Sequence, residues 1–221
     1  MSENIDYYFT ANSPWTYLGA DLFHRIAAKH GSQVRYKPVD LVHIFGLSGG
    51  LPLPKRAPQR QAYRLVELRR WAAWRGLPLN SMPAHFQPTV PHLANRMLVA
   101  LTHAGEDAGP LSRAMMRAVW AEERDIWDPA TLAALATECG LDGEALVSRA
   151  GAAEIEAAYA ANAEDALAAQ VFGAPTYVWR GEPFWGQDRL EMLDAALADG
   201  RAPIPVADFV PAPPAIQGEN S

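Results

Sequence analysis

Cysteine is nearly absent from this chain of 221 residues, whose single example is Cys139. One cysteine cannot form an internal disulfide or a cysteine-rich metal site. The six histidines are dispersed and no H-E-x-x-H or C-x-x-C spacing occurs, so we expect no bound metal. A low cysteine content is typical of proteins in a reducing compartment, and we therefore expect a cytoplasmic protein.

Excess basic charge and long apolar runs are also lacking. The formal net charge is −6, which argues against nucleic acid or an anionic membrane surface as the main partner. No stretch approaches the roughly 20 apolar residues of a membrane span, and the N-terminal MSENIDYYF lacks the pattern of a secretory signal. Hydrophobic residues make up 49% and charged residues 20% of the chain, as in globular domains. We expect a soluble, intracellular protein.

The N-terminal segment alternates between strand and helix patterns. Residues 5–10 (IDYYFT) and 33–41 (QVRYKPVDL) have the patterns of strands. Between them, a helix is expected to begin with Ser13 as N-cap and Pro14 at the first helical position, and to end near Gly31. Such a β-α-β unit makes the two strands parallel and places the start of the helix at the carboxyl end of the first strand.

The rest of the chain predicts a long helical region and then a hairpin. Residues 43–58 are rich in glycine and proline and predict a loop, whereas residues 59–170 have helical patterns almost throughout. Within them, Asp128 and Pro129 form a second N-cap and first-position pair. Aromatic-rich runs on both sides of a turn at Gly181 predict a hairpin, followed by a closing helix over 187–200.

These patterns together predict an α/β fold interrupted by an all-helical insertion. The α/β part would be discontinuous, formed by residues 1–43 and 170–205, and the insertion would span residues 44–169. Residues 206–221 form a proline-rich tail. Three tryptophans of the helical region are expected in the core: Trp71, Trp74 and Trp120.

The tetrapeptide Ser-Pro-Trp-Thr stands where a strand gives way to a helix. Thioredoxin-like disulfide exchangers carry Cys-x-x-Cys at that place, whereas here both outer positions, Ser13 and Thr16, carry hydroxyls. Ser13 could simply cap the helix, which is the interpretation that spacing alone favours. It could also donate a hydrogen bond to a thiolate from another molecule, because a helix N-terminus stabilises anions. The surroundings lack the G-x-S-x-G pattern of an acylating serine.

Three blocks of sequence resemble a known family. FTANSPWTYL and VFGAPTYVWRGEPFWGQDRLEML are similar to the first and late blocks of 2-hydroxychromene-2-carboxylate isomerases and kappa-class glutathione transferases, and RWAAWRGLPL resembles the isomerases' middle block. The resemblance covers nearly the whole chain except the tail. It implies a thioredoxin-like fold with a helical insertion, glutathione as cofactor, a small aromatic carboxylate as substrate and a homodimer. Thr10 and Ala11 depart from the family's usual Asp-Phe.

The same resemblance implies roles for particular residues. Ser13 would hold the glutathione thiolate, beside a cis proline at Pro175, and Ala174 would offer backbone groups to the extended tripeptide. Asp188 would meet the γ-glutamyl ammonium, with Gln187 next to it, and this interpretation is favoured over that of a first-turn acid of the closing helix. Arg60 stands where the family has a lysine for the glycine carboxylate. Arg56, Arg60 and Arg64 recur every fourth residue, and they could instead form a solvated helix face.

The implied reaction interconverts 2-hydroxychromene-2-carboxylate and trans-o-hydroxybenzylidenepyruvate. Addition of a thiolate to the conjugated system makes the double bond single, so that it can rotate before the thiolate leaves. Basic residues would hold the substrate carboxylate, and the loop with His85 and Phe86 could cover the acceptor pocket. A kappa-like transferase that conjugates glutathione to an electrophile, and a thioredoxin-like binding module without catalysis, remain as alternatives. A disulfide exchanger is nearly excluded, because the active positions contain no sulfur.

Overall fold

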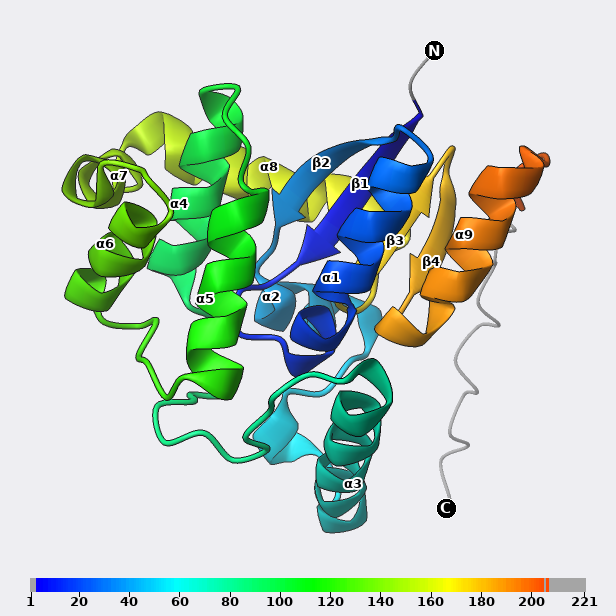
Figure 1. Ribbon diagram of the computed structural model, residues 1–221, viewed down its shortest axis with the longest axis horizontal. Helices are drawn as coiled ribbons and strands as arrows, with labels where there is room; N and C mark the ends of the chain where they lie inside the picture. The colour runs from blue at the N-terminus through cyan, green and yellow to red at the C-terminus, as the bar shows by residue number, and fades with distance from the viewer. Residues whose placement is uncertain (1–2, 205, 207–221) are drawn as a thin grey trace, which may run out of the picture.

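The centre of the fold is a mixed β-sheet (Figure 1). The computed structural model describes residues 3–204 and 206, and in these residues four strands form one sheet in the order β2-β1-β3-β4. β1 pairs in parallel with β2 and antiparallel with β3, and β3 pairs antiparallel with β4, which confirms the predicted β-α-β unit and hairpin. The strands are β1 (Asn4–Phe9), β2 (Gln33–Pro38), β3 (Thr176–Trp179) and β4 (Glu182–Trp185).

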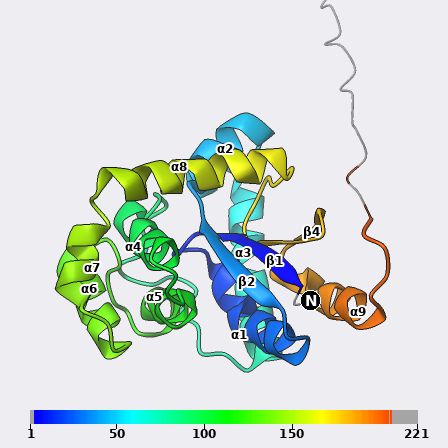
Figure 2. The same cartoon turned by 90° about the horizontal axis from the view of Figure 1, so that it is seen from above.

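Helices cover both faces of the sheet (Figure 2). On one face lie α1 (Pro14–Lys29) and α9 (Leu190–Asp199), and on the other α2 (Leu41–Ser48) and α8 (Ala153–Ala168). Under α1, the rings of Tyr7 and Tyr177 stack with centroids 5.2 Å apart, and Phe23 packs on both. Alternate residues of β1 point to opposite faces, so Tyr8 belongs to the separate cluster under α2 and α8.

The residues between β2 and β3 are largely helical, as the sequence predicts. Met97 and Trp120 from this region are fully buried, in the same apolar cluster as Phe23 of α1. Because one core runs through both regions, the division into residues 1–43 with 170–205 and residues 44–169 stays a prediction. The remaining helices of the region are α3 (Pro58–Arg75), α4 (His92–His103), α5 (Gly109–Ala121), α6 (Pro129–Glu138) and α7 (Gly143–Arg149).

The loop predicted over residues 43–58 is wrong for its first part. Here α2 begins after Asp40, whose carboxylate accepts from the N–H groups of Val42 and His43, both at 3.0 Å. It ends at Gly49, which has a φ of 77° in the left-handed region that glycine favours. A 3₁₀ turn, η1 (Leu53–Lys55), follows. A capped helix with an apolar face therefore occupies a segment whose glycines suggested a loop.

Two further expectations about this region need correction. Trp120 is fully buried as predicted and Trp71 is partly buried, but Trp74 is 79% exposed and does not belong to the core. Arg56 is not on the same helix as Arg60, because α3 begins at Pro58. None of the helices in the described part of the chain is both long and apolar enough to span a membrane. The predicted tail lies outside the described residues, apart from Val206.

Candidate active site

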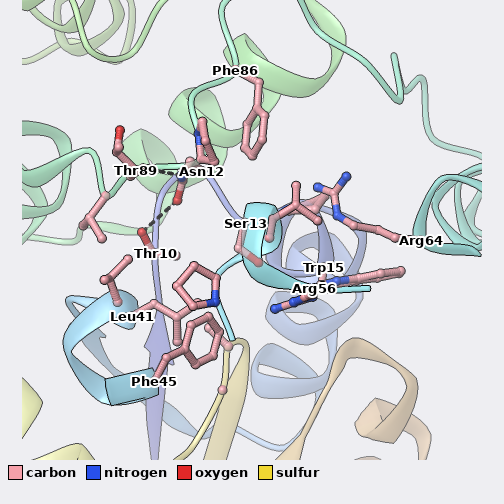
Figure 3. Close-up of a pocket in the computed structure, with 18 of the residues that line it drawn as sticks. Thr10, Asn12, Ser13, Trp15, Leu41, Phe45, Arg56, Arg64, Phe86 and Thr89 are labelled. Carbon is pink, nitrogen blue, oxygen red and sulfur yellow. Dashed lines mark hydrogen bonds between the residues drawn. The ribbon is translucent and has the colours of Figure 1, made fainter. Parts of the chain in front are cut away.

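A cleft of two adjoining lobes opens at the carboxyl end of β1. The first, which we call the Ser13 lobe, is a cavity of about 190 Å³ that Ser13 lines (Figure 3). The second, the Asp188 lobe, is a cavity of about 480 Å³ that Asp188 lines. Five residues line both lobes and join them into one cleft: Trp15, Phe45, Arg56, Ala174 and Trp185.

Ser13 is the N-cap of α1, as the sequence predicts. Its Oγ accepts a hydrogen bond from the N–H of Thr16 at 3.2 Å, and Pro14 follows at the first helical position. The side chain is nearly buried, at 6% exposure, yet it lines the Ser13 lobe. Among the described residues the hydroxyl has no acceptor for its own hydrogen. The hydroxyl can therefore donate to an anion in the lobe, beside a helix terminus that favours negative charge.

The other hydroxyl of the tetrapeptide faces away from the cleft. Thr16 is fully buried, and its Oγ1 has no hydrogen-bond partner in the part of the chain that the structure describes. Thr16 therefore faces the interior of the protein and does not line either lobe. The one thiol, Cys139, is the C-cap of α6, and burial raises the pKa of this thiol. The structure thus separates the chain's sulfhydryl from the place where thioredoxin-like exchangers carry theirs.

A buried amide holds the segment that leads into Ser13, and sequence reasoning missed it. Asn95 of α4 is fully buried and accepts from the N–H of Ala11 at 3.0 Å. Its amide nitrogen donates to the carbonyl of Val39 at 3.2 Å and to the hydroxyl of Tyr159 at 3.0 Å. The available signal was an asparagine within the otherwise apolar face of the segment ANRMLVAL. Asn95 therefore fixes the backbone next to Ser13 from a helix 84 positions along the chain.

Asn12 and Thr10 extend this network into the wall of the Ser13 lobe (Figure 3). The hydroxyl of Thr10 donates to the Asn12 side-chain oxygen at 3.0 Å. The Asn12 amide donates to the carbonyl of Thr89 at 2.9 Å. Thr10 is itself one of the two positions, with Ala11, at which the chain departs from the usual Asp-Phe of the family. Their side chains are engaged within the protein, and they shape the lobe rather than offer free donors to it.

Ala174 and Pro175 lie beside the helix start, and the bond between them is cis, as the resemblance implied. The Pro175 carbonyl accepts from the N–H of Gly186 at 2.8 Å, so that group is engaged in the hairpin. By contrast, within residues 3–204 neither the N–H nor the C=O of Ala174 has a backbone partner. Ala174 lines both lobes. Its free backbone groups are suited to pair with an extended peptide, as an added strand would.

The remaining predicted residues, Arg60, Gln187 and Asp188, gather in the Asp188 lobe. Asp188 is half-exposed and pairs with the neighbouring Arg189 at 2.7 Å. Gln187 is 2% exposed, and its side-chain oxygen accepts from Arg75 at 3.2 Å. This engagement leaves Gln187 less able to contact a ligand than the resemblance implied.

Arginines give the cleft a positive field. Arg56 lines both lobes, Arg60 the Asp188 lobe and Arg64 the Ser13 lobe, so the three diverge instead of forming one solvated face. Burial, together with the like charge of the nearby Arg56, lowers the pKa of the Arg64 guanidinium to about 10. Burial is also the main cause that lowers the pKa of Arg56. No three His, Cys, Asp or Glu side chains converge as a metal site would need, as far as the structure describes the chain.

Comparisons with known proteins agree with the fold. The profile of the DSBA-like thioredoxin domain matches residues 4–198. A 2-hydroxychromene-2-carboxylate isomerase from Pseudomonas sp. (strain C18) is 30% identical over 204 residues, 90% of this chain and 92% of that protein. The solved structure of a 2-hydroxychromene-2-carboxylate isomerase is 26% identical with a TM-score of 0.76, covering 89% of this chain and 95% of that chain.

A more distant solved structure shares the fold alone. The cytosolic disulfide reductase DsbM from Pseudomonas aeruginosa, with GSH, is 17% identical with a TM-score of 0.63, covering 88% of this chain and 99% of that chain. The profile match and the isomerase relatives both extend over most of the chain. The chain therefore belongs to the DSBA-like thioredoxin domain family and, within it, to the 2-hydroxychromene-2-carboxylate isomerases, and it is an isomerase.

Proposed function

We propose that the protein is a glutathione-dependent isomerase that interconverts 2-hydroxychromene-2-carboxylate and trans-o-hydroxybenzylidenepyruvate, or a close aromatic analogue. The observation that carries this proposal is the Ser13 hydroxyl. It is nearly buried, caps α1, and keeps its hydrogen available in a cleft lined by arginines. A donor at a helix N-terminus within a positive field stabilises a thiolate better than a thiol. The names of the isomerase relatives supply the substrate.

The residues of the cleft fit glutathione in chemical type and order. Ala174 offers a free N–H and C=O to the tripeptide backbone and lines the lobe of Ser13 as well as the lobe of Asp188. A carboxylate, Asp188, is available for the γ-glutamyl ammonium, and Arg60 for the glycine carboxylate. Gln187 would form part of the wall around the ligand without accepting a hydrogen bond from it, because its side-chain oxygen already accepts from Arg75. The cysteinyl sulfur would then lie toward Ser13.

Bound glutathione would supply a thiolate that adds reversibly to the conjugated double bond of the substrate and so permits rotation about it. Ser13 donates its hydrogen bond to the charged sulfur and so lowers the pKa of the thiol. The first turn of α1 adds its partial positive charge. The nearby aromatic side chains of the Ser13 lobe limit access of water, which strengthens both interactions.

The proposal also includes the oligomeric state of the protein and its location in the cell. A cytoplasmic homodimer is expected from the cysteine content and the family resemblance. In support of a dimer, α3 exposes Tyr63, Val66 and Trp74, and large apolar side chains gathered on a surface are typical of interfaces. Light scattering of the purified protein should give twice the chain mass, and a monomer at micromolar concentration would contradict the dimer.

The test follows the absorbance of 2-hydroxychromene-2-carboxylate with glutathione, with S-methylglutathione, and without either. The proposal expects turnover only with glutathione, because S-methylglutathione lacks a free thiol, and expects the glutathione to be recovered unchanged. Loss of one glutathione per substrate would instead identify a conjugating transferase. Equal rates with and without glutathione would overturn the proposal.

A further inference from the structure

The Ser13 lobe contains an arginine, Arg64, whose charge no carboxylate in residues 3–204 neutralises. Arg64 extends from α3 toward the lobe, and in the view of Figure 3 its guanidinium lies between Phe86 and Trp15. Its guanidinium carbon is 5.7 Å from the centroid of the Phe86 ring and 5.6 Å from that of Trp120. The aromatic side chains thus hold the head group of Arg64 in place and remove part of its hydration.

Two other arginines of α3 have acidic partners. Arg70 pairs with Glu67 at 2.7 Å and Arg75 with Glu191 at 2.6 Å. Arg64 forms no ion pair with any carboxylate in the described part of the chain, and the charge that acts on it is the like charge of Arg56. A partly buried charge without a counter-charge is unfavourable, which is why buried charges are usually paired. An anionic ligand in the lobe would supply the missing partner.

The walls of the lobe indicate the rest of that ligand. Trp15, Phe45 and Phe86 present aromatic surfaces, and Leu41 and Leu53 add apolar ones. Flat apolar walls around the guanidinium of Arg64, with Arg56 also in the wall, suit a planar conjugated acid better than a sugar or a peptide. The guanidinium is planar as well and can bind both oxygens of a carboxylate.

We propose that the Ser13 lobe is the acceptor subsite and that Arg64 binds the carboxylate of an aryl-conjugated acid whose ring packs against Phe86 and Trp15. This inference rests on the proposed function and names the residue that selects its substrate. Arg56 is less suited to this task, because its Nε already donates to the carbonyl of Leu51 at 2.7 Å. Arg60 lines the other lobe.

The test compares two ligands that differ in charge. trans-Benzylidenepyruvate carries the conjugated ring and the carboxylate, whereas benzylideneacetone has a methyl group in place of the carboxylate. Binding is measured by quenching of tryptophan fluorescence, which Trp15 in the lobe can report. The parent should bind the acid at least about tenfold more tightly than the ketone, because a hydrogen bond to a charged group contributes on that scale. Equal affinities in the parent would overturn the proposal, whatever the variants do.

The variants then assign the selectivity to one side chain. Arg64→Gln should lose the preference for the acid and keep its affinity for the ketone, and Arg64→Lys should retain part of the preference. Arg69→Gln, at an exposed arginine of the same helix, is the matched control and should behave as the parent. Unchanged preference in Arg64→Gln, or an equal loss for both ligands, would overturn the assignment. The measurement needs neither turnover nor glutathione, so a protein that fails to isomerise could still show this subsite.

Discussion

Ser13 shows how one atom changes the chemistry of a fold. At the N-terminus of a helix, a cysteine sulfur would be held as a thiolate and would react itself. The Ser13 oxygen cannot do this, but it keeps one hydrogen free while it caps the helix through the Thr16 N–H. Under the proposed function, the site would stabilise the sulfur of a bound molecule. Ser13 would then act as a hydrogen-bond donor to that sulfur.

Arg60 has two interpretations, and they predict different effects on glutathione binding when the residue is replaced. It is exposed and lines the Asp188 lobe, and it can be either a glutathione contact or a solvated arginine. If it contacts the glycine carboxylate, Arg60→Ala should weaken glutathione binding about tenfold or more, as expected for a lost charged hydrogen bond. The saturated rate should change less, because a remote contact contributes mainly uniform binding. Titration calorimetry measures the affinity, with Arg69→Ala as control. An affinity equal to that of the parent would make Arg60 a surface residue.

At the scale of elements, the site depends on how the connection between β1 and α1 is held. This connection contains Ala11, whose buried N–H bonds to Asn95 of α4. The same amide reaches Val39, just after β2. One side chain from the helical region therefore links the carboxyl ends of two parallel strands. The position of Ser13 therefore depends on the hydrogen bonds of Asn95 as well as on the hydrogen bond by which Ser13 caps α1.

Replacing Asn95 tests this link. Asn95→Ala leaves the N–H of Ala11 and the carbonyl of Val39 without partners, and each such buried group destabilises by about 1–3 kcal/mol. Asn162→Ala is the matched control, because Asn162 donates one hydrogen bond, to the carbonyl of Pro38 at 3.1 Å. Urea unfolding should show a larger loss of free energy of unfolding for Asn95→Ala. Similar losses in the two variants would mean that the network does not hold the connection.

The elements also show what the sequence could predict. The cap at Ser13 and Pro14 was predictable because both residues act within one turn of chain. The helix α2 was not predicted, because the glycines near its end indicated a loop and Asp40 was not recognised as its N-cap. The burial of Asn95 and of Arg64 could not be predicted from the pattern, since it depends on segments that only the folded chain brings together. Local signals identified the helix start, and long-range packing completed the site.

At the scale of the whole molecule, one ion pair ties the last described residues to the sheet. Glu182 of β4 is nearly buried and accepts from Arg201 at 2.7 Å and from the N–H of Ile204 at 2.8 Å. The hydrogen bond from Arg201 is the main cause that holds the pKa of Glu182 below its usual 4.5. Since the folded state favours the carboxylate, this interaction stabilises the fold above that pH. Its contribution is lost as the pH falls through the lowered pKa.

The pH dependence of stability checks this pair. Glu182→Gln should lower the free energy of unfolding at neutral pH, and its difference from the parent should shrink as the pH falls through the lowered pKa of the Glu182 carboxyl group. Glu138→Gln removes an exposed partner of Arg124 and should change stability little. Urea unfolding at several pH values supplies both curves. A deficit of Glu182→Gln that stays constant with pH would contradict the role of the ion pair.

The proposed reaction depends on a thiolate held at the start of α1. The most direct measurement is the thiolate absorbance of bound glutathione as a function of pH, in the parent, in Ser13→Ala and in Asp128→Ala. Asp128 caps α6 before a proline in the same way, so both variants lose about 0.5–2 kcal/mol of stability with the cap. The account predicts that Ser13→Ala alone raises the pKa of the bound thiol, because it removes a hydrogen bond to the charged form. Overlapping titration curves for all three proteins would contradict it and leave Ser13 as a structural cap.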